Sequence, residues 1–349
     1  MEDILKSTLN ELISSSEVNA LLNLLVQLEK KSDFNSKIRE NVTGKIVDAI
    51  FKNTIPIKKT LENGLVFEFI HQNRITRDFL LSSKTKPNHV WEPQTTRLLL
   101  HFSKKVNTVI VGGAYIGDHA VMIANEIKES GICHTFEPDK NSVHYLQNNA
   151  KLNNLNNIKI NPKALWDESG KFIVLEGDDV LGSSIEVTNA TPGSIVTVSV
   201  DDYAKENQLS EIGLIMLDLE GGEYNALKGS INILKTMSPI VVFETHSLYN
   251  DWSKGIQNSE IMQFMQSQGY KLFAIRDFHS NVDTKSIPVE LIPVESINTD
   301  GPPHGFNMLA VKNTNVLDTD FFSIVENLSP KLFIDRKELM NYPSEWLSQ

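Results

Sequence analysis

The spacing of apolar residues divides this chain into regions of different texture. Between residues 1 and 53 the apolar positions recur every three or four residues, the period of an amphipathic helix. One such stripe consists of Val18, Leu21, Leu22, Leu25 and Leu28. Ser16 stands just before it as a candidate cap. We therefore expect helices that pack on their own domain; the alternative use of the stripe is a contact between two copies in a homodimer.

Two shorter signals follow this helical region. In TLENGLVFEFI, Asn63-Gly64 lies between two β-type runs, which predicts a hairpin with a two-residue turn. NHVWEPQTTRLLLHF predicts a helix whose first turn contains Pro93. The buried side of that helix should carry Leu98, Leu99, Leu100 and Phe102.

From Val106 onward, short apolar runs alternate with segments of helical period. The expected strands are 107–112, 132–137, 157–161, 171–176, 194–199, 213–218, 239–244, 270–276 and 306–312. The expected helices are 117–130, 140–153, 222–235 and 256–268, with two more at 319–327 and 335–341. Alternation at this spacing predicts an α/β fold, with a mostly parallel sheet covered by helices on both faces.

Length, charge and cysteine content narrow the classes of protein. A chain of 349 residues can build one large α/β domain plus an accessory region. The formal net charge of −11 argues against a nucleic-acid partner. The single cysteine, Cys133, excludes an intrachain disulfide or a cysteine-based zinc site and suits a reducing compartment. Without a leader-like N-terminus or a run of roughly 20 apolar residues, we expect a cytoplasmic protein with no membrane partner.

The segment TVIVGGAYIGDHAV has the form of a nucleotide-type cofactor loop. Taken as G-x-G-x-x-G it would use positions 112, 114 and 117, but Ala114 replaces the glycine that lets a pyrophosphate approach. Taken as G-x-x-x-G it uses Gly113 and Gly117. That spacing suits S-adenosylmethionine (SAM), which has no phosphate to bind.

A second acidic position supports a nucleoside-containing cofactor. The apolar run in ICHTFEPDK ends at Glu137, 20 residues after Gly117. A carboxylate at that strand end can accept hydrogen bonds from both ribose hydroxyls. The loop and the acid together are more specific than the loop alone.

Acidic residues and a histidine follow two later strands. LIMLDLEGGE places Asp218, Glu220 and Glu223 after one strand, and VVFETH delivers Glu244 and His246 from the next. In an open α/β sheet, ligands bind beyond the carboxyl ends of the strands. We therefore expect this group beside Glu137.

Three interpretations of this group remain open. His246 can act as a general base for an acceptor hydroxyl, oriented by Asp218 or Glu244. Asp218, Glu244 and His246 can instead hold a divalent ion. In the third interpretation, Glu220 and Glu223 only cap the following helix and His246 is a hydrogen-bonded loop residue. For Glu223 itself, capping is the preferred interpretation.

From about His89 to Lys312 the chain resembles the FkbM-type SAM-dependent methyltransferases, a branch of the class I, Rossmann-like fold. The resemblance rests on HVWEPQTTRLLLHF, GAYIG, FEPDKNSVHYLQNNAKLNN, IMLDLEGGEYNALKGSINIL and PIVVFETH. It implies a methyltransferase domain over 89–313, preceded by a helical and hairpin accessory region (1–88) and followed by a helical tail (314–349).

The resemblance also implies where SAM binds. The cofactor-binding residues would be Gly113, Ala114, Tyr115, Gly117, Glu137, Ala164, Leu165, Trp166 and Asp218. The family usually has Asp and Asn where this chain has Val111 and Tyr115. That Asp helps to anchor the amino group of SAM, so here the contact must come from backbone carbonyls or from another acid such as Glu92.

The function expected from this resemblance is O-methylation of a hydroxyl on a small sugar or secondary metabolite. A base near the methyl donor is informative, because only a poorly acidic acceptor such as an alcohol needs one. Glu220 and His304, the latter in the loop NTDGPPHGFNMLAVK, are expected to border the acceptor pocket. A divalent metal is not expected as a cofactor. The alternatives are an N-methyltransferase, or a SAM-fold binding or scaffold protein whose helices at 1–53 form its interaction surface.

Overall fold

The computed structural model describes residues 16–32, 36–51, 56–129, 131–176, 183–284, 287–299 and 305–332. These residues divide into two compact units. The N-terminal unit consists of the described residues within 1–93, 278–286 and 332–349. The sheet unit takes those within 94–277 and 287–331.

The N-terminal unit is helical at its start, as its apolar spacing predicts. Its elements are α2 (Ser16–Lys31), α3 (Ser36–Ile38), η1 (Arg39–Thr43), α4 (Gly44–Phe51), β1 (Ile57–Thr60), β2 (Val66–Phe69) and α5 (Arg74–Leu80). The hairpin predicted around Asn63-Gly64 is present as β1 and β2, paired from Ile57↔Phe69 to Thr60↔Val66. The Leu61 N–H donates to the Leu65 oxygen at 2.7 Å. The turn therefore spans residues 62–64 and is longer than the expected two residues.

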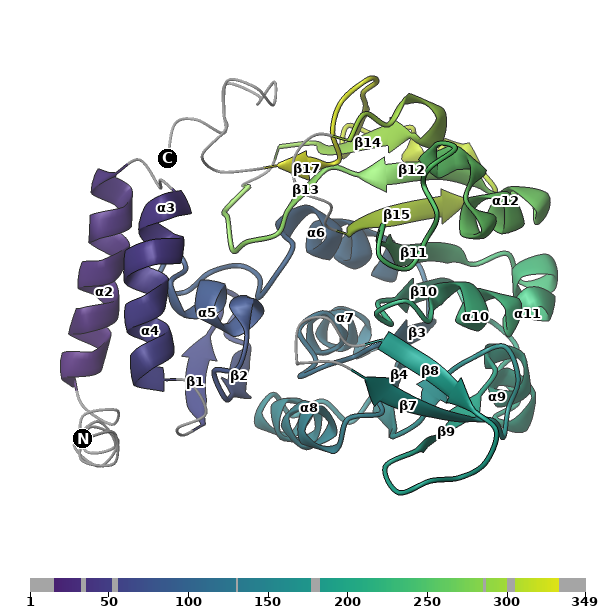
Figure 1. Cartoon of the computed structure of the whole chain (residues 1–349), viewed down its shortest axis with the longest axis horizontal. Helices are drawn as coiled ribbons and strands as arrows, with labels where there is room; N and C mark the ends of the chain where they lie inside the picture. The colour runs from purple at the N-terminus through teal and green to yellow at the C-terminus, as the bar shows by residue number, and fades with distance from the viewer. Residues whose placement is uncertain are drawn as a thin grey trace. The chain divides into compact units, whose positions relative to one another are not determined.

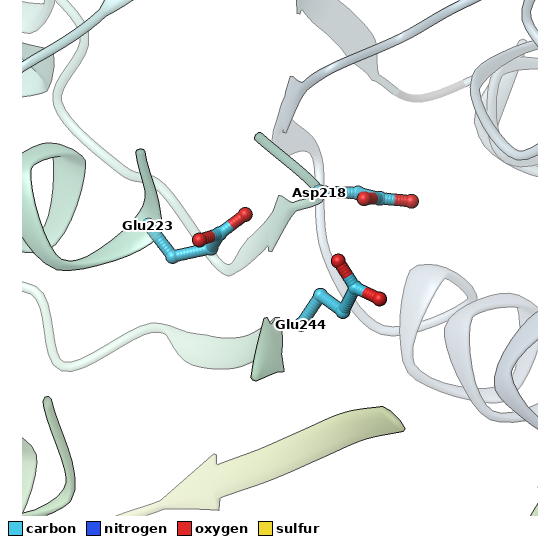
Figure 2. Close-up of side chains that lie close together, drawn as sticks. All are labelled: Asp218, Glu223 and Glu244. Carbon is cyan, nitrogen blue, oxygen red and sulfur yellow. The ribbon is translucent and has the colours of Figure 1, made fainter. Parts of the chain in front are cut away.

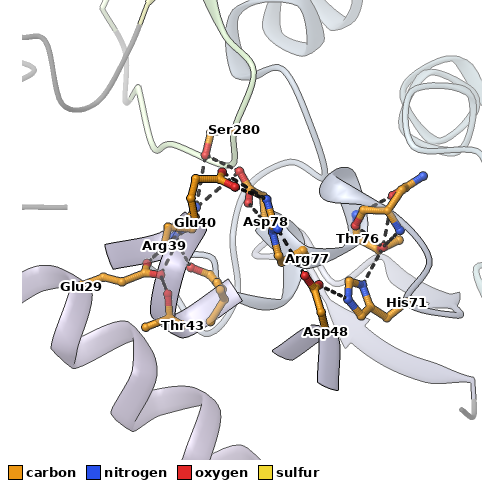
Figure 3. A network of polar contacts seen from close by, with 12 residues as sticks. Glu29, Arg39, Glu40, Thr43, Asp48, His71, Thr76, Arg77, Asp78 and Ser280 are labelled. Carbon is orange, nitrogen blue, oxygen red and sulfur yellow. Dashed lines mark hydrogen bonds and ion pairs between the residues drawn. The ribbon is translucent and has the colours of Figure 1, made fainter. Parts of the chain in front are cut away.

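The buried face of α2 differs from the predicted stripe. Leu25 is buried, but Leu28 is 43% exposed and the neighbouring Glu29 is 1% exposed. Glu29 turns inward because Arg39 bonds its carboxylate at 2.5 Å and the Thr43 hydroxyl donates to the same group (Figure 3). A buried ion pair thus sets the rotation of the helix where apolar spacing alone predicted Leu28 inside.

Figure 3 shows that this pair belongs to a larger polar network in the N-terminal unit. Arg39 also lies 3.5 Å from Asp78, whose carboxylate accepts a 2.8 Å hydrogen bond from the Ser280 hydroxyl. Asp78 is as deeply buried as Glu29. One guanidinium therefore offsets two buried carboxylates.

The sheet unit is built on a nine-stranded sheet in the order β16-β14-β12-β15-β11-β10-β3-β4-β5 (Figure 1). The strands are β3 (Thr108–Gly112), β4 (Ile132–Phe136), β5 (Ile158–Asn161), β10 (Leu214–Leu217), β11 (Ile240–Thr245), β12 (Lys271–Ile275), β14 (Val289–Pro293), β15 (Phe306–Val311) and β16 (Phe322–Ile324). Strands β5, β4, β3, β10 and β11 pair in parallel, while β15 lies antiparallel between β11 and β12. The mostly parallel sheet predicted from the sequence is confirmed.

Helices cover both faces of this sheet, as Figure 1 shows. They are α6 (Pro93–Ser103), α7 (Ala120–Ile127), α8 (Lys140–Leu152), α9 (Val200–Glu206), α10 (Glu223–Lys228), α11 (Ile231–Thr236) and α12 (Glu260–Ser267). Alternate strand residues such as Ile110, Ile215 and Phe243 pack in one apolar core with α9 to α12. Their neighbours Val109 and Val242 are equally buried and must face the opposite side. Burial on both faces explains the continuous apolar runs.

Several elements depart from the sequence expectations. A four-stranded sheet has the order β6-β9-β7-β8, and the sequence predicts only two of its strands, at 171–176 and 194–199. It consists of β6 (Ala164–Leu165), β7 (Phe172–Glu176), β8 (Ser183–Val187) and β9 (Ile195–Val198). The helix expected over 222–235 is broken into α10 and α11 at Gly229-Ser230. The helix expected over 319–327 is wrong, because β16 forms there and pairs with β14; the helix expected over 335–341 lies outside the described residues.

Short elements complete the description. They are the 3-10 turns η2 (Ile256–Asn258), η3 (Val294–Ser296) and η4 (Thr314–Leu317), and the paired strands β13 (Asp277–Phe278) and β17 (Lys331–Leu332). Within the part of the chain that the structure describes, no helix is both long enough and apolar enough to cross a bilayer.

The polar network of the N-terminal unit generates the first prediction. Arg39→Met leaves Glu29 and Asp78 buried without their shared cation, so the N-terminal unit should lose roughly 3–5 kcal/mol of unfolding free energy. Urea denaturation, together with hydrogen exchange of the α2 and α4 amides, measures this loss. The matched control is Glu40→Gln, since Glu40 is 48% exposed in its pair with Arg77 and should change stability by less than about 1 kcal/mol. Equal effects of the two substitutions would contradict the prediction.

Candidate functional site

The glycine loop after β3 touches the end of β10 through its backbone. Gly113 has a φ of +72°, and a Cβ added there would lie 1.6 Å from the carbonyl oxygen of Asp218. Beside this contact, the Asp218 N–H donates to the Gly112 oxygen at 3.0 Å. Only glycine combines this backbone conformation with so close an approach. The loop and Asp218 therefore lie together where the strand order changes direction, since β4 follows on one side of β3 and β10 lies on the other.

Glu137 lies directly beside this loop, at the carboxyl end of β4. Its Oε2 accepts the N–H of Tyr115 at 2.7 Å, and its Oε1 accepts the N–H of Asp139 at 2.9 Å. Tyr115 has a φ of +43°, a left-handed conformation that turns its amide toward the carboxylate. Each carboxylate oxygen can accept a further hydrogen bond, so the group can hold the loop and still take ribose hydroxyls.

Burial changes the acidity of Glu137. Its side chain is almost inaccessible to solvent, and this desolvation raises its pKa to about 7, with the charges of Asp139 and Asp118 adding to the shift. The two backbone N–H groups oppose the shift without cancelling it. A hydrogen-bonding or cationic ligand would therefore meet a carboxyl group that ionises less readily than an exposed glutamate.

The acidic turn after β10 is shaped by its last acid, Glu223. The Glu223 carboxylate accepts the N–H of Leu219 at 2.5 Å and that of Gly221 at 3.1 Å. It thus satisfies amides just ahead of α10, which agrees with the capping role preferred from the sequence. Its burial raises its pKa to about 7, with the charge of Glu220 contributing.

Three carboxylates from neighbouring elements meet at this edge. Asp218 follows β10, Glu223 begins α10 and Glu244 lies near the end of β11 (Figure 2). One oxygen from each lies within 4.8 Å of the others. Such an all-oxygen set suits Mg²⁺ or Ca²⁺ better than zinc. The structure thus groups Asp218 and Glu244 with Glu223, whereas the divalent-ion interpretation of the sequence used His246 with Asp218 and Glu244.

His246 lies beside Glu244 but is held by a backbone amide. A Cβ added at Gly305 would lie 2.0 Å from Glu244 Oε1 and 3.0 Å from His246 Cδ2, so both side chains flank Gly305. His246 Nδ1 accepts the N–H of Leu248 at 2.9 Å. Burial, with the charge of Lys331, lowers the pKa of His246. The neutral ring therefore carries its proton on Nε2, which is a hydrogen-bond donor.

Tyr249 is a site residue that the sequence analysis missed. Its hydroxyl lies 3.5 Å from Glu220 Oε2, and its ring centroid lies 5.5 Å from that of His246. Its ring also borders Gly221, where an added Cβ would come within 2.9 Å of it. Burial and the charges of Glu220, Glu244 and Glu223 raise its pKa to about 12. The only sequence signal was an aromatic residue in the loop after a strand that ends in acids.

The residues expected around adenine lie on β6 and just after it. Leu165 contacts the glycine strand, since a Cβ at Gly112 would be 2.8 Å from its side chain. Ala164 and Trp166 pack with Ile173 in a small apolar cluster. The Trp166 indole N–H donates to Glu186 Oε2 at 3.1 Å. The structure therefore brings Leu165 to the loop and gives Trp166 a packed, hydrogen-bonded place.

The remaining residues predicted from the sequence are Glu92, His304 and Glu220. Glu92 belongs to the N-terminal unit, where its carboxylate lies 3.5 Å from His279 Nε2. His304 lies outside the described residues. Glu220 is exposed and adopts a left-handed φ of +48°.

The buried acids generate a prediction on pH. The folded pKa of Glu223 is about 7 and its ordinary value is 4.5, so the folded state binds the extra proton between these values. The stabilisation of the folded state by this extra proton is therefore present at low pH and is lost as the pH rises through that window. Glu223→Gln removes this titrating group, so the variant should not lose stability in this way. The difference in unfolding free energy, variant minus unaltered chain, should therefore rise by roughly 1–3 kcal/mol between pH 4.5 and pH 7.5.

Urea denaturation at a series of pH values measures that difference. The control is Glu211→Gln, because Glu211 is exposed. Its difference from the unaltered chain should stay constant with pH. A constant difference for Glu223→Gln as well would refute the assignment of a raised pKa.

Part of the sheet unit matches a known protein family. Residues 112–272 match the family described as the methyltransferase FkbM domain. No curated protein matches the chain. One similar solved structure is the methyltransferase FkbM from Methylobacillus flagellatus KT, at 13% identity and a TM-score of 0.38, covering 58% of this chain and 43% of that one. This chain thus spans less than half the length of that protein.

Two further solved structures are similar at the same level. A putative O-methyltransferase from Klebsiella pneumoniae has 12% identity and a TM-score of 0.33, covering 63% of this chain and 80% of its own. Precorrin-6y C5,15-methyltransferase from Geobacter metallireducens GS-15 has 10% identity and a TM-score of 0.34, covering 63% and 89%. At these scores nothing about their substrates is carried over to this chain. The matched residues 112–272 span the glycine loop, Glu137 and the acidic turn, so this part of the chain is similar to the methyltransferase FkbM domain.

Proposed function

We propose that this chain is a SAM-dependent methyltransferase that methylates a hydroxyl group of a small sugar, polyol or secondary metabolite. The observation that carries the proposal is the bond from the Tyr115 N–H to Glu137 Oε2, which fixes a carboxylate against the glycine loop. The loop and the carboxylate lie at the switch point of a parallel sheet, where ligands of such folds bind. The FkbM domain match covers both.

The residues around the loop fit an adenosyl cofactor. Glu137 would accept the ribose hydroxyls, and the backbone of Gly113 to Gly117 would run along the methionine end. Leu165, which already contacts Gly112, offers an apolar surface to the adenine. SAM supplies a methyl group on a sulfonium that is already activated for transfer. The chain then has to align the acceptor and exclude water.

The acidic lining also suits this cofactor electrostatically. The charges of Asp118 and Asp139 act on Glu137, and those of Glu220, Glu223 and Glu244 act on Tyr249. Fixed negative charge around a pocket attracts and stabilises a cationic ligand. The sulfonium and ammonium groups of SAM are both cations.

On the acceptor side, Glu244 and His246 would divide the handling of the proton. Because His246 Nδ1 holds the Leu248 N–H, its Nε2–H can donate to the acceptor oxygen and orient it. Glu244 offers the carboxylate that takes the hydroxyl proton as the new bond forms. His246 could serve as the base itself only after releasing Leu248.

A second candidate is N-methylation. Its support is the same acidic lining, because carboxylates from Asp218, Glu223 and Glu244 within 4.8 Å of one another would also suit an amine. An amine acceptor would need no base once it is deprotonated. The contribution of Glu244 to the rate therefore distinguishes N-methylation from O-methylation. A scaffold without catalysis would bind neither SAM nor its product.

Binding of S-adenosylhomocysteine tests the cofactor assignment. Calorimetry should show binding to the unaltered chain, and Glu137→Gln should weaken it by about 10- to 100-fold, because one acceptor for the ribose becomes a donor. The control Glu211→Gln exchanges an exposed acid of the same unit and should leave the affinity unchanged. Absence of binding to the unaltered chain would favour the scaffold.

Methyl transfer to a panel of sugars, polyols and amines tests the chemistry. Glu244→Gln should lower the turnover of a hydroxyl acceptor by roughly 10²–10⁴-fold, since the proton acceptor is lost. S-adenosylhomocysteine affinity should hardly change in this variant. His246→Ala should also slow turnover. Transfer to amines alone, with Glu244→Gln fully active, would replace O-methylation by N-methylation.

A further inference from the structure

Buried polar side chains gather where the first turn of α6 meets the turn after β3. They are Gln94, Thr95, Thr96, Asp118, His119 and Asn307. Most side chains on this face of the sheet are apolar, as Val109 and Val242 illustrate. A concentration of polar groups inside an apolar layer is costly unless each has a partner in the protein or in a ligand.

Two short sets of side-chain contacts link most of these residues within the sheet unit. The Asn307 amide lies 3.3 Å from Thr95 Oγ1, and Thr96 Oγ1 lies 3.3 Å from His119 Nδ1. His119 Nε2 in turn lies 3.9 Å from the Asp118 carboxylate. The histidine thus lies between a hydroxyl and an acid.

Asp118 directly follows Gly117, the last glycine of the cofactor loop. It is 8% exposed, and its charge acts on Glu137, whose Oε2 holds the loop amide of Tyr115. The negative charge of Asp118 therefore adds to that of Glu137 near the loop. A cation bound beside the loop would offset this negative charge.

The resemblance to the FkbM-type methyltransferases implies an acid near the amino group of SAM at the position of Val111, which is buried within β3. The acid suggested from the sequence as a replacement, Glu92, belongs to the N-terminal unit and pairs with His279. Asp118 is an acid of the sheet unit next to the loop itself. Its neighbour Glu137 is already assigned to the ribose.

We propose that Asp118, positioned by His119 and Thr96, binds the α-ammonium group of SAM in place of the missing acid at position 111. This inference rests on the proposed function. In it, Glu137 takes the ribose and Asp118 takes the amino-acid end of the same ligand. The two acids should therefore respond differently to ligands that lack one end.

Two probes separate these roles by calorimetry. S-adenosylhomocysteine has the adenosine and the amino-acid end, whereas 5′-methylthioadenosine has only the adenosine. Asp118→Asn should weaken S-adenosylhomocysteine binding by about 10- to 100-fold and leave 5′-methylthioadenosine binding within about twofold. Glu137→Gln should weaken both probes. Glu92→Gln, the control for the alternative acid, should weaken neither.

Several results would overturn the inference. Unchanged S-adenosylhomocysteine affinity in Asp118→Asn removes the ammonium contact, as does an equal loss for both probes, which would mean that Asp118 only supports the fold. A loss in Glu92→Gln instead would return the role to Glu92. If the unaltered chain binds neither probe, the proposed function fails and this inference falls with it.

The melting temperature checks that each variant folds. Should Asp118→Asn not fold, Asp118→Glu keeps the charge and shifts it by one methylene. It should still weaken S-adenosylhomocysteine selectively. Equal binding of both probes to a folded Asp118→Glu, at the affinities of the unaltered chain, would count against the contact.

Discussion

The contact between Gly113 and the carbonyl of Asp218 is the constraint on which the site depends. Because no side chain fits between them, the loop after β3 and the turn after β10 are in direct backbone contact. That contact places Glu137 on one side of the loop and the acidic turn on the other. A larger residue at 113 would separate the two halves of the site before it affected any residue that carries chemistry.

The site is held together by carboxylates that bind backbone amides. Glu137 fastens the loop and the turn before α8, and Glu223 fastens the turn before α10. Both carboxylates accept backbone N–H groups, and burial raises the pKa of both to about 7. Such groups reduce stability at neutral pH, but they preorganise negative charge where a cationic cofactor would lie. A loss of stability of this kind is expected at a binding site.

Glu244 and His246 show how a local backbone contact can fix the position of a proton. Glu244 and His246 are two residues apart, which places both at one edge of the sheet. The Leu248 amide then fixes the proton of the neutral imidazole on Nε2. A donor and a proton acceptor therefore stand side by side, and Tyr249 closes over the acidic turn next to them.

The sequence by itself determined the alternation of strands and helices, the glycine loop, and the acids at the strand ends, because apolar period and turn chemistry are local properties. It could not determine that Glu29 turns inward instead of Leu28, that β16 replaces a helix, or that Glu223 joins Asp218 and Glu244. Those outcomes depend on partners distant in the chain, such as Arg39 for Glu29 and β14 for β16. Local pattern fixes which residues can face a core or a ligand, and only tertiary contacts decide which of them do.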